Sequence, residues 1–402
     1  MPLALLAIVI ASAAPGASAQ KRSEPLVSKA ALSDAIEAGV GYLTNAVDER
    51  GKFTYRINLD PSLPVEEKYN ILRHAGAIYA LAEAYERQPD PEILAAMTRA
   101  GGFMKAEAIA GVPGEEDLLA VWSRDSLNKA GKPEQAKLGG AGLGLVALVS
   151  LERLSPGSTE IEDLRSIARF ILFMQKKDGS FYSKYYAGRG RDDSWTSLFY
   201  PGEAALGLLM LHEIDPNPAW VAGAADALDF LARSREGRPS VPIDHWALIA
   251  SERLLALDQG DGSVDRELIE AHAAQIVEEI LRSRPALDEK APIASFVADG
   301  RTTPTATRVE GLVAALNIIP EDRRALRRRS RHAIEEGVAF LVRAQVRDGP
   351  HRGATPRALR RLSLTPDNAN FNRRASEVRI DYVQHSLSAF IGFEDALKAA
   401  TQ

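Results

Sequence analysis

Apolar residues recur along this chain in two patterns that take turns. In residues 29–47 they return every third or fourth position, as at Leu32, Ile36 and Val40, which predicts a helix with one buried face. In residues 138–154 apolar and small residues occur on every side, which is typical of a helix buried all round.

The two patterns alternate to the end of the chain and predict six helices of each kind. The amphipathic helices are expected at 29–47, 91–108, 159–176, 218–234, 265–283 and 323–346. The buried helices are expected at 70–87, 138–154, 201–214, 244–257, 305–319 and 381–398.

The ends of the amphipathic segments are also similar to one another. Residues 170–181, 340–349 and 42–53 each carry an amphipathic helix that a glycine stops, followed by a stretch with extended character. One supersecondary unit is therefore repeated, with a period of about 60 residues, longer than the periods of short helical-repeat solenoids.

This alternation predicts an all-α fold, an (α/α)6 toroid in which six inner helices surround an axis and six outer helices surround them. Residues 20–402 are expected to form this one domain. The chain resembles the six-hairpin glycosidase-like proteins, which include glycoside hydrolases, polysaccharide lyases and uronyl epimerases. The segment Gln175–Phe181 is also similar to the repeat of terpenoid cyclases and protein prenyltransferases. Both resemblances imply a toroid but no particular reaction.

Loop lengths indicate where a site should lie. The connections from an amphipathic helix to the next buried helix are mostly long, as at 52–69, 109–137 and 349–380, whereas most of the reverse connections are short. In a toroid the long connections share one face, and the inner helices begin on it. Six helix N-termini also favour an anionic ligand there.

Polar and aromatic residues at those N-termini are the candidate site residues. We expect Glu203 and Asp244 to act as paired carboxyls of a glycosidase, because they open adjacent inner helices. The candidates for auxiliary proton transfer are Tyr200, His74, His245 and His385. The candidates for substrate binding are Arg73, Asp193, Trp195, Trp246, Arg308, Glu310, Asp381 and Tyr382.

Several of these residues also fit purely structural roles. Thr307 and Glu310 have the spacing of a capping box, and Asp244 and Asp381 stand where N-caps are wanted. Glu203 could complement the dipole of its own helix from the first turn. The sequence leaves these alternatives open. It also leaves open an interaction between Asp381 and His385, which lies four residues later.

The composition narrows the chemistry. The chain has no cysteine, which excludes disulfides, thiolate nucleophiles and Cys-ligated zinc. None of the seven histidines has the spacing of a zinc motif, so no metal and no cofactor are expected. The glycine-rich start at 139–144 follows no strand and favours close helix packing over a nucleotide site.

Charge suggests the kind of ligand. Residues 323–379 contain fifteen arginines and five acidic residues. The arginines of 323–331 fit a solvated helix face, whereas Arg352, Arg357, Arg360, Arg361, Arg373 and Arg374 fall in the last long connection. Arginine suits carboxylates and sulfates, so an acidic polysaccharide or oligosaccharide is expected, and nucleic acid is disfavoured by the overall charge of −5.

The first residues predict export. Residues 3–10 are apolar, and small residues ending at Ala17-Ser-Ala19 precede Gln20, as at a signal-peptide cleavage site. We therefore expect residues 1–19 to be removed, a periplasmic or secreted protein, and no membrane span after cleavage. Nothing in the sequence indicates an oligomeric state.

Together these features favour an exported carbohydrate-active enzyme, with a glycoside hydrolase as the leading hypothesis. A lyase or epimerase acting on uronic acids would use the histidines and arginines instead. In a non-catalytic toroid that binds glycans or serves as an envelope scaffold, the same polar residues at the inner-helix N-termini would serve as helix caps. A terpenoid-cyclase-like function is disfavoured, because Arg191-Asp-Asp193 lacks the acidic cyclase pattern.

Overall fold

The structure is a computed structural model that describes residues 25–124, 127, 133–258, 260, 264–285 and 295–399. The expected signal peptide at 1–19 lies outside the described residues, so its cleavage stays a prediction.

Twelve long helices form the body of the described chain, at the positions that the two apolar patterns predict. The outer helices are α1 (Lys29–Asn45), α3 (Pro91–Ala108), α5 (Ile161–Phe173), α7 (Pro218–Arg235), α9 (Arg266–Arg282) and α11 (Arg324–Ala344). The inner helices are α2 (Ile71–Arg87), α4 (Leu138–Leu154), α6 (Tyr200–Ile214), α8 (His245–Leu257), α10 (Thr302–Ile318) and α13 (Ile380–Ala399). The last connection adds η2 (Pro366–Asn368) and the short α12 (Ala369–Arg374).

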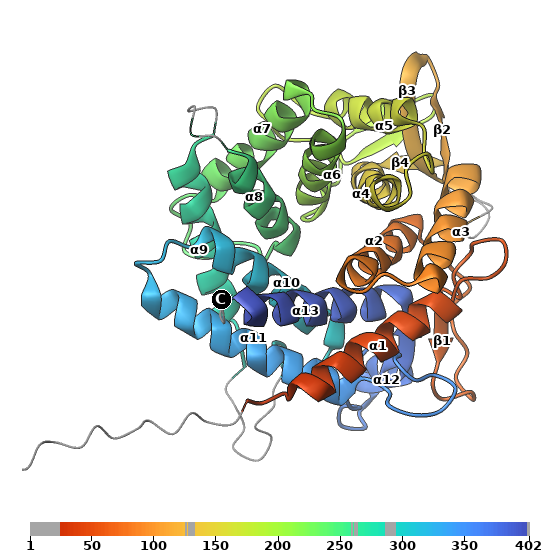
Figure 1. Ribbon diagram of the computed structural model, residues 1–402, viewed down its shortest axis with the longest axis vertical. Coiled ribbons are helices and arrows are strands. Elements are labelled where there is room, and N and C mark those ends of the chain that lie inside the picture. The colour runs from red at the N-terminus through yellow and green to blue at the C-terminus, as the bar shows by residue number, and fades with distance from the viewer. Residues whose placement is uncertain are drawn as a thin grey trace, which may run out of the picture.

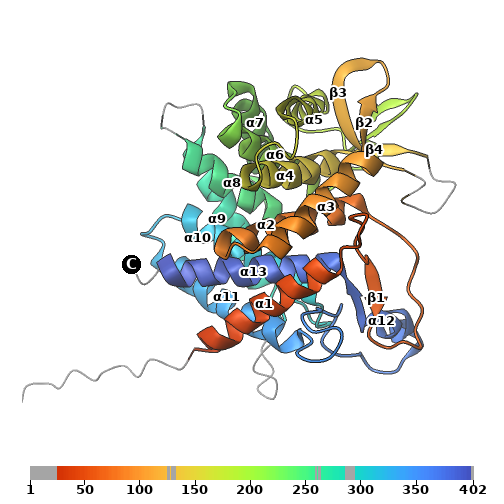
Figure 2. The ribbon, with the colours of Figure 1, turned by 45° about the vertical axis from the view of Figure 1, so that its right-hand side comes forward.

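The inner helices close into a ring. Each packs against the next, from α2 through α4, α6, α8 and α10 to α13, and α13 returns to α2 (Figure 1). The outer helices lie around this ring, with α1 and α11 against α13, as Figure 2 also shows. The predicted (α/α)6 toroid is therefore confirmed.

All the strands lie in the long connections that lead from outer to inner helices. A five-stranded antiparallel sheet has the order β2 (Ile109–Val112), β3 (Glu115–Ser123), β4 (Gln135–Lys137), β5 (Lys184–Tyr186) and β6 (Gly190–Asp192). A second pair joins β1 (Arg56–Asn58) to β7 (Glu377–Arg379), with Arg56 opposite Arg379. This pair ties the first long connection to the last one at the face where the inner helices begin.

Helix α10 begins earlier than the sequence pattern predicts. Helix α10 begins at Thr302, three residues before the predicted start, and Pro304 is accommodated in its first turn. Thr307 therefore lies inside the helix, where its hydroxyl donates to the carbonyl of Thr303 at 3.1 Å. The predicted capping box of Thr307 and Glu310 is wrong.

The repeated turn after an outer helix has a clear physical reason. Gly51 and Gly179 have φ values of 86° and 85°, and a Cβ on either would fall 1.9 Å or 2.3 Å from a backbone oxygen of the next outer helix. In the third copy Gly353, with φ of 89°, takes this role against α1, and not the expected Gly349. Only glycine fits a turn that packs so closely on the next outer helix.

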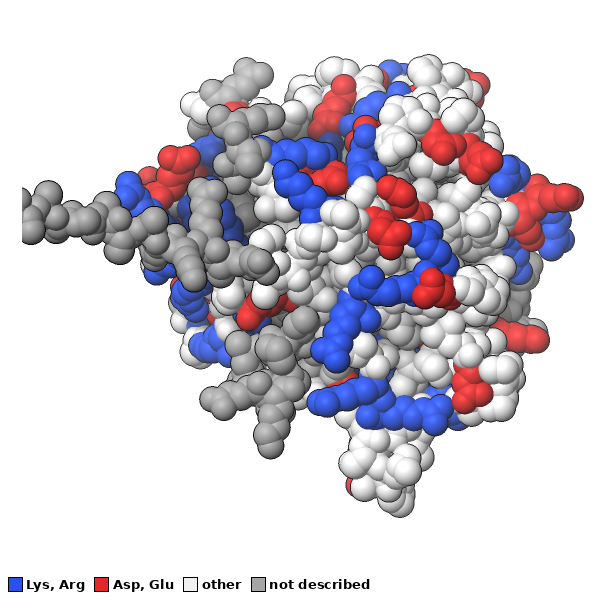
Figure 3. All heavy atoms as spheres, turned by 60° about the horizontal axis from the view of Figure 1, so that its bottom comes forward, with Lys and Arg blue, Asp and Glu red and all other residues white. Residues whose placement is uncertain are grey.

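The surface of this fold is mixed in charge. Figure 3 shows the side at the bottom of Figure 1, where basic side chains form several groups with acidic ones between them. The arginines at the start of α11 are exposed except for the half-buried Arg327, which largely agrees with the predicted solvated face. Within the described residues, no helix has both the length and the apolar character needed to cross a membrane.

Candidate active site

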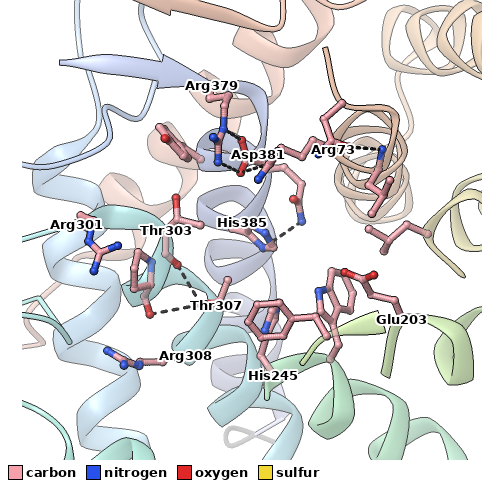
Figure 4. Close-up of a pocket in the computed structure, with 18 of the residues that line it drawn as sticks. Arg73, Glu203, His245, Arg301, Thr303, Thr307, Arg308, Arg379, Asp381 and His385 are labelled. Carbon is pink, nitrogen blue, oxygen red and sulfur yellow. Dashed lines mark hydrogen bonds and ion pairs between the residues drawn. The ribbon is translucent and has the colours of Figure 1, made fainter. Parts of the chain in front are cut away.

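A cavity of 550 Å³ lies where the inner helices begin, on the face of the long connections. All six inner helices contribute to its lining, α4 through Leu143 alone. The cavity therefore lies on the face that the long connections predict. Of the predicted site residues, those that line it are Arg73, Tyr200, Glu203, His245, Trp246, Arg308, Asp381, Tyr382 and His385 (Figure 4).

Two histidines from different inner helices face each other in this cavity. The rings of His245 on α8 and His385 on α13 are 5.5 Å apart between centroids, at an interplanar angle of 72°. Trp246 packs beside both rings, at 5.0 Å from His245 and 6.3 Å from His385. The two rings are separated by 140 positions in the chain, and only closure of the toroid brings them together.

The surroundings of the two histidines differ. Burial, reinforced by the nearby His385, holds the pKa of His245 well below its ordinary value, and its Nε2 has no hydrogen-bond partner among the described residues. Burial also acts to lower the pKa of His385, but the adjacent Glu310 carboxylate more than offsets this, so that pKa is raised. His245 is therefore neutral at neutral pH, whereas Glu310 favours the protonated form of His385.

Glu310 is the residue that orients His385. Its Oε2 lies 2.9 Å from Nδ1 of His385, and both side chains are largely buried. Burial raises the pKa of Glu310, and the contact with His385 opposes this rise. Glu310 does not line the cavity itself but stands behind His385, between it and a second cavity at the other end of the inner helices. The bond leaves Nε2 of His385 for a ligand.

Glu203 lies on the other side of the cavity, next to Tyr200. Burial and the charge of Asp244 hold the pKa of Glu203 well above its ordinary value, which favours the protonated form of its carboxyl. Its Oε2 is buried and has no partner among the described residues. Gly139 of α4 makes room for both side chains, since a Cβ there would fall 2.1 Å from Oε2 of Glu203 and 2.3 Å from Tyr200.

Asp381 is held by two arginines and is not a helix cap. It lies in the first turn of α13, 2.9 Å from Nε of Arg73 and 2.5 Å from Nε of Arg379. Although burial acts to raise it, these arginines lower the pKa of Asp381. The predicted N-cap role is therefore wrong for Asp381, and no hydrogen bond joins it to His385, which bonds to Glu310 instead.

Asp244 has a structural role. It caps α8 by accepting a hydrogen bond from the backbone N–H of Ala247 at 3.1 Å, and its other oxygen pairs with the buried Arg235 at 3.1 Å. It is fully buried and absent from the cavity lining. The alternative of an N-cap is therefore confirmed, and the geometry does not place Asp244 and Glu203 on either side of a substrate.

Three other predicted residues lie away from the cavity. His74 is fully buried between the hydroxyl of Tyr69, 2.7 Å from its Nδ1, and the carbonyl of Ala100, 2.8 Å from its Nε2. Asp193 pairs with Lys176 at the surface, at 2.6 Å. Trp195 is half exposed and contacts the ring of Tyr200 edge to face. None of the three lines the cavity.

The cavity also contains residues that were not among the site candidates. These residues include Gln384, Thr303 and four arginines, which are Arg301, Arg357, Arg374 and Arg379. Arg357 and Arg374 had been noted only as part of a basic loop. Arg301 and Thr303 were missed because α10 was expected to begin at 305, which left both in a loop.

The side chains of His245, Glu310 and His385 have the donor types that hold divalent cations. Their ligand atoms lie within 4.8 Å of one another. A cation bound there would have to displace the proton that joins Glu310 to His385. We therefore interpret the group as a hydrogen-bonded pair facing a second imidazole, and the expected absence of a metal stays a prediction.

Comparisons with known proteins identify the fold. No family model and no curated protein matches the chain. Among solved structures it is similar to a D-mannose isomerase, with 14% identity and a TM-score of 0.62 over 92% of this chain and 98% of that one. It is also similar to a possible member of the GH105 family from Salmonella enterica serovar Paratyphi A, with 12% identity and a TM-score of 0.62 over 97% and 100%.

A third similar structure is the GH76A α-1,6-mannanase of a Salegentibacter species, with 11% identity and a TM-score of 0.60 over 90% of this chain and 99% of that one. These identities are too low to transfer an activity, but the coverage extends over nearly the whole toroid. The chain therefore has the (α/α)6 toroid fold of the six-hairpin glycosidase-like proteins.

Proposed function

We propose that this protein is a sugar isomerase or epimerase that moves a proton at the carbon next to a carbonyl group. The observation that carries the proposal is the pair of imidazoles in one cavity, His245 and His385, with pKa values shifted in opposite directions. Such pairs divide the work of general base and general acid.

The proposed reaction follows from that division. A ring nitrogen of neutral His245 takes the proton from C2 of the open-chain sugar, while protonated His385 donates to the carbonyl oxygen. The electron pair of the C–H bond forms the C1–C2 double bond of an enediol. Return of a proton to C1, with loss of the C2 hydroxyl proton to the now neutral His385, gives the ketose. Return of a proton to the other face of C2, with loss of the C1 hydroxyl proton to His385, gives the epimer. Glu310 favours the charged form of His385, in which each cycle begins and ends.

The surroundings support a small substrate. The cavity volume of 550 Å³ is in the range of small-molecule sites, and Trp246 offers an aromatic face beside both histidines. One of the structures similar to this chain is a D-mannose isomerase, so the fold accommodates this chemistry.

A glycoside hydrolase is the second candidate, favoured by one observation. Glu203 lines the cavity, its pKa is raised, and its Oε2 has no hydrogen-bond partner among the described residues, as suits a general acid. Its predicted partner Asp244 is occupied as a cap, and the other carboxylate that lines the cavity, Asp381, is paired with Arg73 and Arg379. A uronate lyase would use the same histidine base as the isomerase.

A panel of substrates separates these reactions. The full-length protein is incubated with neutral aldoses, ketoses and uronates, and separately with neutral and acidic polysaccharides. Interconversion of monosaccharides, followed by NMR, supports the proposal. New reducing ends from polysaccharides support the hydrolase, and ultraviolet-absorbing unsaturated products support the lyase. Binding of a glycan without any turnover would favour a non-catalytic toroid.

Export is also part of our proposal, on the basis of residues 1–19 alone. The N-terminus of the protein recovered from the periplasm or medium, read by mass spectrometry, should begin near Gln20. Intact protein retained in the cytoplasm would contradict export.

A further inference from the structure

Six arginines line the cavity, and four of them have a carboxylate partner. Arg73 and Arg379 share Asp381, at 2.9 Å and 2.5 Å. The other two pairs are Arg301 with Asp299 at 2.7 Å and Arg374 with Glu377 at 3.0 Å. Three carboxylates therefore offset most of these four charges, and each of the four guanidinium groups already has an ion-pair partner within the protein.

Arg308 and Arg357 are different. Among the described residues, neither has a carboxylate partner. The Nη1 of Arg308 donates to the backbone carbonyl of Phe296 at 2.7 Å. The guanidinium of Arg357 lies over the ring of Phe371, 4.8 Å from its centroid, and its Nη1 is buried without a hydrogen-bond partner.

The fold brings these two arginines to the same wall of the cavity. Arg308 lies in the second turn of α10, and the carbonyl of Arg357 accepts the backbone N–H of Thr302, the first residue of that helix, at 3.0 Å. A β-bridge between Arg301 and Ala358 fixes the same contact. In Figure 4 Arg301, Thr303 and Arg308 lie across the cavity from Glu203.

The wall has further unused capacity for an anion. The hydroxyl oxygen of Thr303 is buried and unpartnered, and α10 begins without a side-chain cap. Burial first, and then repulsion from Arg301, lowers the pKa of Arg308, and Asp299 opposes this only in part. Burial also lowers the pKa of Arg357, with repulsion from Arg374 and Arg301, and Tyr382 and Glu377 oppose this only in part. Partly buried cations of like sign are costly unless an opposite charge compensates them.

We propose that Arg308, Arg357 and Thr303 form a subsite for a negatively charged group of the substrate, so that the sugar carries a carboxylate, a sulfate or a phosphate. Guanidinium groups bind such oxyanions through two parallel hydrogen bonds, and the hydroxyl adds a third donor. This assignment rests on the proposed function, because the proposed function is what identifies the rest of the ligand as a sugar. The subsite therefore holds the charged group while His245 and His385 act on another carbon.

Binding measurements test this subsite without turnover. Titration calorimetry compares D-glucuronate with D-glucose, and inorganic sulfate with inorganic phosphate, on the wild-type protein. Glucuronate should bind at least about 10-fold more tightly than glucose, and the preferred inorganic anion identifies the class of charged group. Equal affinity for glucuronate and glucose, with no binding of either inorganic anion, would overturn the proposal.

Variants locate the effect. Arg308→Gln and Arg357→Gln should each weaken binding of the preferred anion by about 10- to 100-fold and leave glucose binding unchanged. Arg308→Lys and Arg357→Lys keep the charge and should recover part of the loss. Arg328→Gln, on the exposed face of α11, is the matched control and should bind the anion as the wild type does. Unchanged anion affinity in both glutamine variants would refute the subsite.

Thermal unfolding excludes a merely structural role. Because neither arginine is ion-paired, Arg308→Gln and Arg357→Gln should unfold at the same or a higher temperature without ligand, and the anion should stabilise only the wild type. If the glutamine variants were unstable, the lysine variants would provide the comparison, and failure of both to change anion affinity would count against the subsite.

The two proposals fail in different ways. A protein whose variants lose anion binding, but which moves no proton on any sugar, would keep the subsite and refute the isomerase. Isomerisation of a negatively charged sugar such as glucuronate at an equal rate by the wild type and by the doubly substituted Arg308→Gln/Arg357→Gln protein would keep the isomerase and refute the subsite.

Discussion

The imidazole rings of His245 and His385 lie 5.5 Å apart on two different inner helices, at the mouth of the toroid. We expect His245→Gln and His385→Gln each to reduce kcat by about 100-fold or more, because each removes one partner of the proton transfer. The corresponding His332→Gln, at an exposed histidine of α11, should leave kcat unchanged. Wild-type rates in either cavity variant would contradict the assigned roles.

Glu310 should set the pH range of activity. The pKa of His385 is raised by Glu310, and the reaction needs protonated His385, so activity is lost as the pH rises through that pKa. Glu310→Gln removes the negative charge and should move this loss to lower pH. Glu252→Gln, which replaces a carboxyl of α8 that bonds to Asn317, is the control and should leave the pH profile in place. An identical profile for the wild type and Glu310→Gln would refute the role of Glu310.

Asp244 and Glu203 should respond in opposite ways to neutral substitutions. Asp244→Asn leaves Arg235 buried without its charge partner, so we expect a loss of about 3 kcal/mol in the free energy of unfolding, measured with denaturant. Glu203→Gln mimics the neutral form that the raised pKa of Glu203 favours and should keep kcat within about 10-fold of the wild type. Complete loss of activity in Glu203→Gln, with the fold intact, would favour the hydrolase instead.

Gly139 should be intolerant of a side chain. In Gly139→Ala the new methyl group would displace Glu203 and Tyr200, at a cost of about 1–3 kcal/mol in the free energy of unfolding and with reduced substrate affinity. Gly41→Ala is the matched control, because its Cβ would meet no atom within 4 Å and alanine is the better helix former. Equal stability of Gly139→Ala and the wild type would show that the α4–α6 contact is looser than described.

Buried histidines should make the fold sensitive to acid. Burial lowers the pKa of His74 to about 4, so between pH 6.5 and 4 the unfolded state binds a proton that the folded state excludes. Folding lowers the pKa of this basic side chain, so protons favour the unfolded state. The free energy of unfolding therefore falls by about 3 kcal/mol as the pH drops through this window. Denaturation of His74→Gln at pH 7 and pH 4.5 should show a smaller loss than the wild type. An equal loss in both proteins would contradict this account.

The helices and the location of the cavity could be predicted from the sequence because both depend on local signals. Apolar spacing placed the ends of α3 and α4 at the residues where the structure has them. The long connections correctly indicated the face on which the inner helices begin.

The pairing of side chains could not be predicted in the same way. Glu310 and His385 bond across 75 positions, and Asp381 meets Arg73 across 308 positions, so neither contact leaves a local pattern. The roles of Glu310 and Asp381 were therefore left open between cap and ligand. For Asp244 the local signal of an N-cap was correct, and the expected catalytic pairing had no such support.

The most direct test of the central claim is exchange of a carbon-bound hydrogen with solvent. The wild-type protein is incubated with the preferred sugar in D₂O, and the C1 and C2 protons of substrate and product are followed by NMR. Our account predicts deuterium at these carbons with the wild type, and none above background with His245→Gln. Turnover without any deuterium at C1 or C2, or exchange at the wild-type rate in His245→Gln, would contradict it.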